Sequence, residues 1–174
     1  DQKVYLMNKL KQLLIVLVCL GSITTNAQKV FNVINHGAAG DGKTDDAIAI
    51  QKTIDACAAA GGGQVLFPAS HVYLSGPIQL KSNINLHLEA GAVLLANPDE
   101  KIYTKSAFRD NPGEGTIWIG GEKLENVMLS GLGEINGNGI SFMGAELEDS
   151  YVLKPFNIMD PRPHVITIIG GKNI

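Results

Sequence analysis

Charged residues are scarce in this sequence, and positive charge is scarcer than negative charge. Lysine and arginine total 14 against 17 aspartates and glutamates, which gives a formal net charge of −3 over 174 residues. Nucleic acids and anionic membranes attract proteins with a positive field, so this balance predicts neither as a partner. Aromatic residues make up only 6% of the chain, whereas glycine occurs 20 times. Such a composition favours many short strands joined by turns over a helical bundle.

No apolar run is long enough to span a membrane. The longest, residues 13–20 (LLIVLVCL), is short, because a membrane-spanning helix needs about 20 apolar residues. It follows the basic residues 7–11 and precedes Thr25-Asn26-Ala27, which resembles a small-residue cleavage site. This order predicts a secretory signal peptide that is cut after Ala27. The protein is therefore expected to be secreted or periplasmic, with no stable membrane insertion.

Cysteine is nearly absent, since only Cys19 and Cys57 occur. Residues 1–27 are expected to be upstream sequence and signal peptide, and residues 28–174 the N-terminal part of a single domain. Cys57 then has no partner for a disulfide. Its place in a helical pattern predicts a small buried apolar residue in preference to a reactive thiol. Cys19 leaves open the alternative of a lipoprotein anchored through that residue.

The clearest helical pattern follows a glycine-rich turn at residues 36–43. Thr44 is expected to cap the helix, with Asp45 and Asp46 in its first turn, where the helix dipole favours carboxylates. Gly61-Gly62-Gly63 is expected to end it, because glycine readily adopts the left-handed conformation. The apolar positions that recur at helical spacing on one face are Ala47, Ile50, Ile54, Cys57 and Ala58.

After this helix the hydrophobic period changes from 3.6 to 2. Residues 83–88 (NINLHL) alternate most cleanly, which places Ile84, Leu86 and Leu88 on one face of a strand. The polar residues 98–115 are expected to form a loop. Strands are expected at residues 30–34, 64–67, 72–74, 83–88, 92–95, 117–119, 127–129 and 165–169.

A weak internal repeat runs through these strands. Asn83, Asn126 and Asn173 each precede an apolar residue at the start of a repeat, at intervals of 43 and 47 residues. Each interval suits two coils of about 20–25 residues, within the range of solenoid repeats. The pattern favours an all-β parallel β-helix (solenoid) with an N-terminal capping α-helix. A β-sandwich is the alternative, because Asn136-Gly137 and Asn138-Gly139 are hairpin signals.

Residues 37–44 match the phosphate-loop spacing G-x-x-x-x-G-K-[ST] between an expected strand and an expected helix. Three observations weigh against a nucleotide site. The signal peptide directs the protein to a compartment with little nucleoside triphosphate, and Asp45 and Asp46 would repel phosphates at the helix N-terminus. The chain also lacks the repeated strand–helix units of a nucleotide-binding sheet. We interpret the motif as a turn and a helix cap, and expect no nucleotide and no cofactor.

Several segments together resemble a known enzyme family. Residues 37–46 and 61–65 resemble the N-terminal signature of pectin-degrading right-handed β-helix enzymes. Residues 86–94 (LHLEAGAVL), 131–139 (GLGEINGNG) and Arg162-Pro163-His164 narrow the resemblance to glycoside hydrolase family 28, the polygalacturonases and rhamnogalacturonases. It extends over residues 30–174 and implies a right-handed parallel β-helix.

The resemblance implies inverting hydrolysis of α-1,4-galacturonide linkages in a pectic polysaccharide, by one aspartic acid and one aspartate base. The family's Asn-x-Asp, Asp-Asp, Gly-His-Gly and Arg-x-Lys segments follow its Arg-Pro segment, and none follows Arg162-Pro163 here. Asp45-Asp46 and Asp99 match by letter but not by place. We therefore expect no catalytic residue within this chain, and expect the catalytic residues to lie downstream of Ile174.

Two further expectations follow from this reading. The chain alone should be inactive, and it should be aggregation-prone at its open end. A non-catalytic carbohydrate-binding or adhesion module and a pectate-lyase-like enzyme are the alternatives to a hydrolase.

Few residues are candidates for contacting a substrate. Arg162 and His164 could bind an acidic sugar, although a turn arginine and a strand-edge histidine also serve structure. Trp118 is expected to pack beneath the loop of residues 98–115, with stacking on a sugar as the alternative. The histidines show no metal-ligand spacing, so no metal is expected.

Overall fold

The structure is a computed structural model that describes residues 2–7, 9, 11, 28–106, 115–146, 153–155 and 162–174. Most of the predicted signal peptide, including Cys19 and the cleavage site at Ala27, lies outside the described residues. Within the described ranges, no helix is both long and apolar enough to cross a bilayer.

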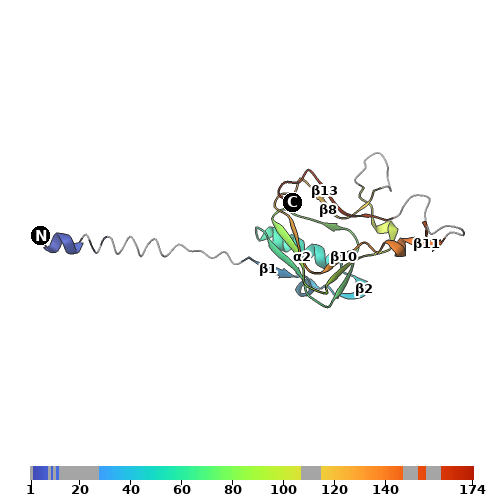
Figure 1. Ribbon diagram of the computed structural model, residues 1–174, viewed down its shortest axis with the longest axis horizontal. Coiled ribbons are helices and arrows are strands. Elements are labelled where there is room, and N and C mark those ends of the chain that lie inside the picture. Colours follow the sequence, from blue (N-terminus) through green and yellow to red (C-terminus); the bar gives the residue numbers. More distant parts are fainter. Residues whose placement is uncertain are drawn as a thin grey trace.

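The described chain coils so that successive strands stack into three parallel sheets (Figure 1). The first sheet has the order β1 (Val30–Asn32), β3 (Gly63–Phe67), β6 (Ile84–Leu88) and β9 (Met128–Gly131). The second has the order β2 (Asp41–Asp45), β4 (Val72–Ser75), β7 (Val93–Ala96) and β10 (Glu134–Asn136). The third has the order β5 (Ile78–Gln79), β8 (Ile117–Glu122) and β13 (His164–Ile169). This arrangement is a parallel β-helix.

Besides helix α2 (Ala47–Ala59), shorter elements also lie between these strands in the sequence. They are the antiparallel pair β11 (Met143–Glu146) and β12 (Leu153–Pro155), and the short 3-10 helices η1 (Ile34–His36), η2 (Glu100–Ile102) and η3 (Gly139–Phe142). The sandwich alternative is wrong, because the strands of all three sheets pair in parallel. The Asn-Gly signals form no hairpin, since β10 ends at Asn136 and η3 begins at Gly139.

The core is the interior of the coil. On β6, Ile84, Leu86 and Leu88 are buried, whereas Asn85 and His87 are half-buried on the other face, as their alternation predicts. Burial of each such aliphatic side chain contributes about 1.5–3 kcal/mol. On the outer face, the Ser130 hydroxyl donates to Asn85 Oδ1 at 2.8 Å and lies 2.8 Å from His87 Nδ1. Polar side chains on neighbouring coils thus form hydrogen bonds with one another.

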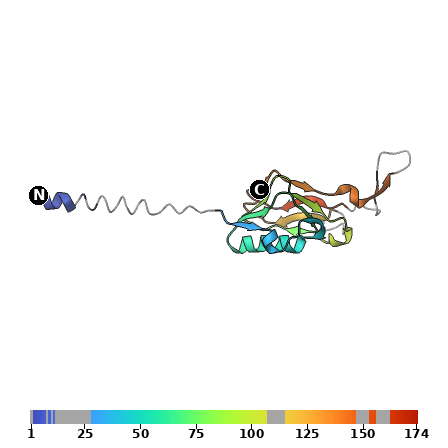
Figure 2. The ribbon, with the colours of Figure 1, turned by 90° about the horizontal axis from the view of Figure 1, so that it is seen from below.

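Helix α2 (Ala47–Ala59) covers the first coil and runs along one edge of the fold (Figure 2). Ile50, Ile54 and Cys57 are fully buried and join the same core as the strands, as predicted. Cys57 is a free cysteine, and burial raises the pKa of its thiol, which confirms its apolar role. Ala49 and Thr53 are also buried, whereas the expected Ala47 and Ala58 are only half-buried.

The helix begins later than the sequence predicts. Thr44 lies in β2, so its assignment as the helix cap is wrong. The Thr44 hydroxyl and amide both donate to the Asp41 carboxylate, at 2.9 and 2.8 Å, and are therefore engaged before the helix starts. Asp45 Oδ1 instead accepts from the amide of Ala47, the first helical residue, at 2.9 Å. The helix is followed by Gly61-Gly62-Gly63, all with positive φ, as expected.

The repeat interval corresponds to one coil and not to two. Asn126 Nδ2 donates to Asn83 Oδ1 at 2.8 Å, and Asn173 Nδ2 donates to Asn126 Oδ1 at 3.0 Å, so the three asparagines stack on successive coils. We call Asn83, Asn126 and Asn173 the asparagine ladder. The coil that begins at β3 is short, because Gly63 pairs with Ile84, 21 residues later. The next two are longer because they contain the segments between β7 and β8 and between β10 and β13.

Candidate functional site

In the loop that matches the phosphate-loop spacing, backbone amides donate hydrogen bonds to carboxylates of the protein itself. The amides of Ala39 and Gly40 donate to the two carboxylate oxygens of Asp46, at 2.6 and 3.0 Å. Asp46 is only 2% exposed. A phosphate loop needs such amides free to face its ligand. Their use by a buried carboxylate supports the interpretation of this segment as a structural turn.

A second carboxylate acts in the same way at the other end of this loop. Asp41 Oδ1 accepts from the amides of Thr44 and Lys43, at 2.8 and 2.9 Å. These hydrogen bonds, led by that from Thr44, lower the pKa of the Asp41 carboxyl below its ordinary value. The aspartate therefore stays ionised, which further disfavours a phosphate beside it.

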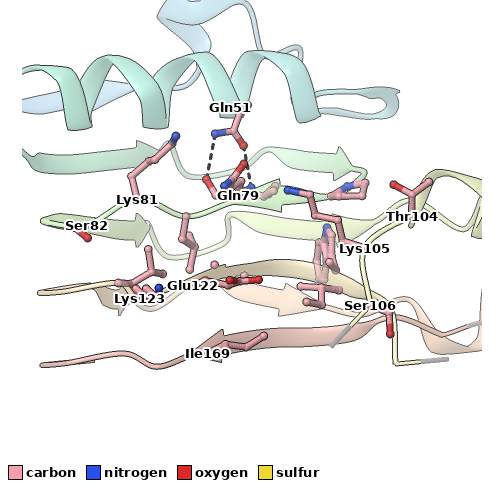
Figure 3. Close-up of a pocket in the computed structure, with 18 of the residues that line it drawn as sticks. Gln51, Gln79, Lys81, Ser82, Thr104, Lys105, Ser106, Glu122, Lys123 and Ile169 are labelled. Atoms are coloured by element: carbon pink, nitrogen blue, oxygen red, sulfur yellow. Dashed lines mark hydrogen bonds between the residues drawn. The ribbon is translucent and has the colours of Figure 1, made fainter. Parts of the chain in front are cut away.

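A groove with a volume of about 750 Å³ lies across β5, β8 and β13 (Figure 3). We call it the third-sheet groove. Helix α2 bounds it through Gln51, and the segment of residues 102–106 forms another wall. Ile169 at the end of β13 lies at its far side (Figure 3). The groove therefore runs across the strands, along the direction in which the coils stack.

A pair of glutamines fixes the helix side of this groove. Gln51 Nε2 donates to the carbonyl oxygen of Gln79 at 3.1 Å, and the Gln79 amide donates to Gln51 Oε1 at 2.9 Å (Figure 3). The Gln51 side chain thus acts as an additional strand partner for the short β5. This bidentate contact holds α2 against the third sheet.

A buried tyrosine holds the loop side of the groove. Tyr103 is 4% exposed and donates its hydroxyl to the Asn97 carbonyl at 2.6 Å. Its ring packs against Phe142, with the centroids 6.0 Å apart. Burial is the main cause that raises the pKa of Tyr103 far above its ordinary value, so the hydroxyl remains a donor. This anchor positions the neighbouring residues 104–106 beside the groove.

Trp118 lies in the floor of the groove and is fully buried. Residues Ile102 and Thr104 of the expected loop line the same groove. The packing of Trp118 beneath that loop stays a prediction. Within the described part of the chain, Trp118 Nε1 has no hydrogen-bond partner. An unsatisfied buried donor of this kind costs about 1–3 kcal/mol. Because the ring is covered, it is not available to stack on a sugar in this conformation.

The charge of the groove differs from that of the whole chain. Its described lining residues include three lysines, Lys81, Lys105 and Lys123, and one acidic residue, Glu122, whereas the chain carries a net charge of −3. Lys81 Nζ lies 3.8 Å from Asp55 Oδ1, and both side chains are well exposed, so this pair contributes little stability. The local excess of ammonium groups suits the binding of a carboxylated ligand.

The two residues predicted to bind substrate lie outside this groove. Arg162 is exposed just before β13, and His164 is exposed at the first position of that strand. The His164 amide donates to the Thr116 carbonyl at 2.7 Å, and His164 pairs with Ile117 of β8. Only the far end of β13 contributes to the groove. The substrate role of Arg162 and His164 stays a prediction.

The catalytic residues are predicted to lie downstream of Ile174. Ile174 itself does not line the third-sheet groove. It follows β13, is 60% exposed and is absent from the described lining. The preceding residue, Asn173, donates its side chain to Asn126 on the coil below, so this segment serves the stacking of the coils. An aliphatic side chain can neither donate nor accept a proton, which leaves Ile174 without a chemical role. The location of the catalytic residues beyond Ile174 stays a prediction.

Sequence reasoning missed the three lysines of the groove, although one signal was present. A lysine stands one to three residues before every ladder asparagine, as Lys81, Lys123 and Lys172. Equivalent positions on successive coils lie side by side in a β-helix, so the sequence could have predicted that Lys81 and Lys123 lie close together. The position of Lys105 could not be predicted in this way, because it depends on how the segment of residues 102–106 folds back.

The fold places this chain among the parallel β-helix proteins. The family model described as rhamnogalacturonase A/epimerase, pectate lyase-like, matches residues 30–127, more than half of the chain. The protein belongs to this family.

Curated relatives agree with this assignment. The exo-poly-α-D-galacturonosidase of Dickeya chrysanthemi is 36% identical over 129 residues, which cover 67% of this chain and 21% of that protein. Polygalacturonase-2 of Solanum lycopersicum is 30% identical over 129 residues, covering 69% of this chain and 25% of that protein. The chain therefore spans a quarter or less of the length of these relatives.

Solved structures show the same fold. The family 28 exopolygalacturonase of Yersinia enterocolitica is 34% identical with a TM-score of 0.56, over 65% of this chain and 21% of that chain. The exopolygalacturonase of Thermotoga maritima is 30% identical with a TM-score of 0.57, over 65% of this chain and 26% of that chain. The predicted right-handed parallel β-helix with a capping helix and the resemblance to glycoside hydrolase family 28 are confirmed.

Relatives with other functions also match. Plasmin and fibronectin-binding protein A of Streptococcus pneumoniae is 30% identical over 172 residues, covering 82% of this chain and 22% of that protein. Mannuronan C5-epimerase AlgE3 of Azotobacter vinelandii is 48% identical over 61 residues, covering 31% of this chain and 3% of that protein. Family membership alone does not therefore select one activity.

Proposed function

We propose that this chain is the N-terminal part of a glycoside hydrolase that cleaves α-1,4-galacturonide linkages of a pectic polysaccharide with inversion. The observation that carries the proposal is the 36% identity to an exo-poly-α-D-galacturonosidase over 129 residues. The likeness to two exopolygalacturonases in structure supports it. The proposed substrate is a polyanion, and the excess of lysines in the third-sheet groove is compatible with it.

The proposed chemistry requires two carboxyl groups about 6.5–9.5 Å apart, so that a water molecule fits between one of them and the sugar. Two aspartates of this chain that match the family motifs by letter have structural partners instead. Asp45 accepts from the amides of Ala47 and Gly76 and from Asn97 Nδ2, and Asp99 accepts from the Lys101 amide. We therefore propose that the catalytic acids lie on coils that follow Ile174.

The full-length product of the gene is expected to release reducing ends from de-esterified polygalacturonate. Proton NMR of the first products should show the inverted anomer, because water attacks directly on the face opposite the leaving group. The 174-residue chain alone is the matched control and is expected to release none. Products with an ultraviolet-absorbing unsaturated end would show a lyase and contradict the proposal.

A non-catalytic adhesion module is the second candidate, because the match to plasmin and fibronectin-binding protein A covers 82% of the chain. The same experiment separates the two candidates. A full-length product that releases neither reducing nor unsaturated ends, yet binds plasmin or fibronectin on an immobilised surface, would favour adhesion over hydrolysis.

We also propose that the protein acts outside the cytoplasm, through the predicted signal peptide that lies within residues 1–27. When the gene is expressed in a secreting bacterial host, the exported protein is expected to begin at Gln28, because cleavage is predicted after Ala27. N-terminal sequencing of the protein outside the inner membrane checks this. A lipid-modified N-terminus at Cys19, or retention of the uncleaved chain in the cytoplasm, would contradict it.

A further inference from the structure

We propose that Gln28 is a modification site. Once the leader is cut after Ala27, the new α-amino group of Gln28 closes onto the side chain of the same residue, so that the exported protein begins with a pyroglutamate. The inference rests on the proposed export and cleavage, and it goes beyond the proposed function because it does not depend on hydrolysis. It gives a chemical role to the first residue of the folded domain.

The reaction is an intramolecular lactam formation. The neutral α-amino nitrogen attacks Cδ of the Gln28 side chain, and the new N–Cδ bond closes a pyrrolidone ring. The Cδ–Nε2 bond breaks, and Nε2 leaves as ammonia with a proton from the attacking amine, so the step needs no oxidant and no co-reactant. An α-amino group has a pKa of about 7.7–8.0, so a substantial fraction of it is neutral and nucleophilic near pH 7.5.

The first argument is that the side chain of Gln28 is available for this reaction. Gln28 is exposed and precedes β1, which begins at Val30. Within the described ranges, its side chain takes part in no hydrogen bond and no ion pair. Ring closure therefore breaks no contact of the fold.

The second argument is the charge around the new terminus. Gln28 lines a hollow of about 630 Å³ together with Asn83 and Asn126 of the asparagine ladder. Lys29 is the only charged residue among the described residues of this lining. A neighbouring carboxylate would hold an α-amino group in its charged form, whereas a neighbouring ammonium favours the neutral, reactive form.

The third argument is what lies immediately behind Gln28. Lys29 Nζ donates to the carbonyl of Ala60 at the end of α2, and the Lys29 carbonyl accepts from the Gln64 amide of β3, both at 2.8 Å. Lys29 also lies so close to Gly63 that a Cβ atom there would overlap the Lys29 carbonyl oxygen. An aminopeptidase would remove Lys29 in its second step. A lactam presents no primary α-amine to such an enzyme, so it preserves the contacts that fasten the capping helix.

The test is mass spectrometry on the full-length product of the gene, exported from a secreting bacterial host and kept at neutral pH over several days. The protein is digested after acidic residues, because a cut after Lys29 would leave too short a peptide. The expected N-terminal peptide begins at Gln28 and is lighter by one ammonia than the peptide with an open glutamine. The matched control is Gln28→Ala, which has no side-chain amide and is expected to keep an open α-amine.

Resistance to a broad-specificity aminopeptidase is the second measurement. The wild-type chain is expected to keep its N-terminus, whereas the Gln28→Ala variant should be trimmed from residue 28 onward and should melt at a lower temperature after trimming. The same behaviour of both chains, whether trimmed or intact, would contradict the protective role of the lactam.

A further preparation separates this inference from the proposed cleavage. A leader that a specific protease removes directly before Gln28 makes the full-length chain begin at that residue, whether or not the native leader is a signal peptide. An open α-amine that persists in this chain overturns the inference, even if export and hydrolysis are observed. An exported chain that begins at another residue overturns both the cleavage and the inference.

Discussion

Replacing Gly131 with alanine is expected to destabilise the protein by about 3–5 kcal/mol, the combined cost of a strained backbone and an overpacked site. Gly131 has φ +104°, and a Cβ atom there would overlap the Leu88 carbonyl oxygen. That oxygen accepts from the amides of Leu132 and Gly133, at 3.0 and 3.1 Å. The overlap therefore lies at the ends of β6 and β9, where two successive coils leave the first sheet and turn toward the second. Urea denaturation at 25 °C measures the loss.

The matched control is Gly61→Ala. Gly61 also has a positive φ, of +90°, but no atom lies within 4 Å of the position a Cβ would occupy. This variant should lose only the conformational contribution, about 1 kcal/mol. If the two substitutions cost the same, the close approach of the coils at Gly131 has no energetic effect and the explanation is wrong.

Replacing Asp46 with alanine is expected to cost about 3–5 kcal/mol, because two charge-assisted hydrogen bonds are lost at about 1.5–3 kcal/mol each. The carboxylate is 2% exposed and accepts from the amides of Ala39 and Gly40. Its own backbone joins β4 to α2, since its amide donates to the Leu74 carbonyl and its carbonyl accepts from Ile50. Loss of the side chain should therefore loosen the turn that leads into the capping helix. Urea denaturation again measures the change.

Two comparisons isolate the role of this carboxylate. Asp46→Asn retains one acceptor oxygen and should lose about half as much free energy of unfolding as Asp46→Ala. Asp41→Ala removes an exposed carboxylate that accepts three hydrogen bonds, and should nevertheless have a smaller effect because water replaces it. Equal losses for the alanine variants at both positions would mean that burial of Asp46 is unimportant.

The sequence was sufficient to predict the architecture because its local signals agree with one another. The alternation of residues 83–88 identified β6 and its buried face, and the spacing of Ile50, Ile54 and Cys57 identified the buried face of α2. Glycines at 61–63 marked the end of the helix. Each of these signals depends on burial or on backbone conformation within a few residues, which a sequence pattern records directly.

The failures concern contacts between distant residues. Thr44 looked like a helix cap, but Asp41 engages both its amide and its hydroxyl. The asparagine interval predicts two coils where the structure has one, because residue numbers do not distinguish a second coil from a long loop. β5 has two residues and no periodic pattern, and it is held by β8 and by the side chain of Gln51 on the helix. The groove likewise depends on Lys105, whose place is set by the anchor at Tyr103.

The asparagine ladder has a consequence for how such a molecule can change. Its members are separated by 43 and 47 residues, yet the side-chain contacts between them are nearly the same, at 2.8 and 3.0 Å. The difference in length is absorbed outside the sheets, so residues added to a loop leave the stacking of later coils in phase. The loops that form the walls of the third-sheet groove can therefore be lengthened or shortened while the geometry of the core stays the same. A new ligand preference is accessible to this fold by insertion and deletion, and not only by substitution.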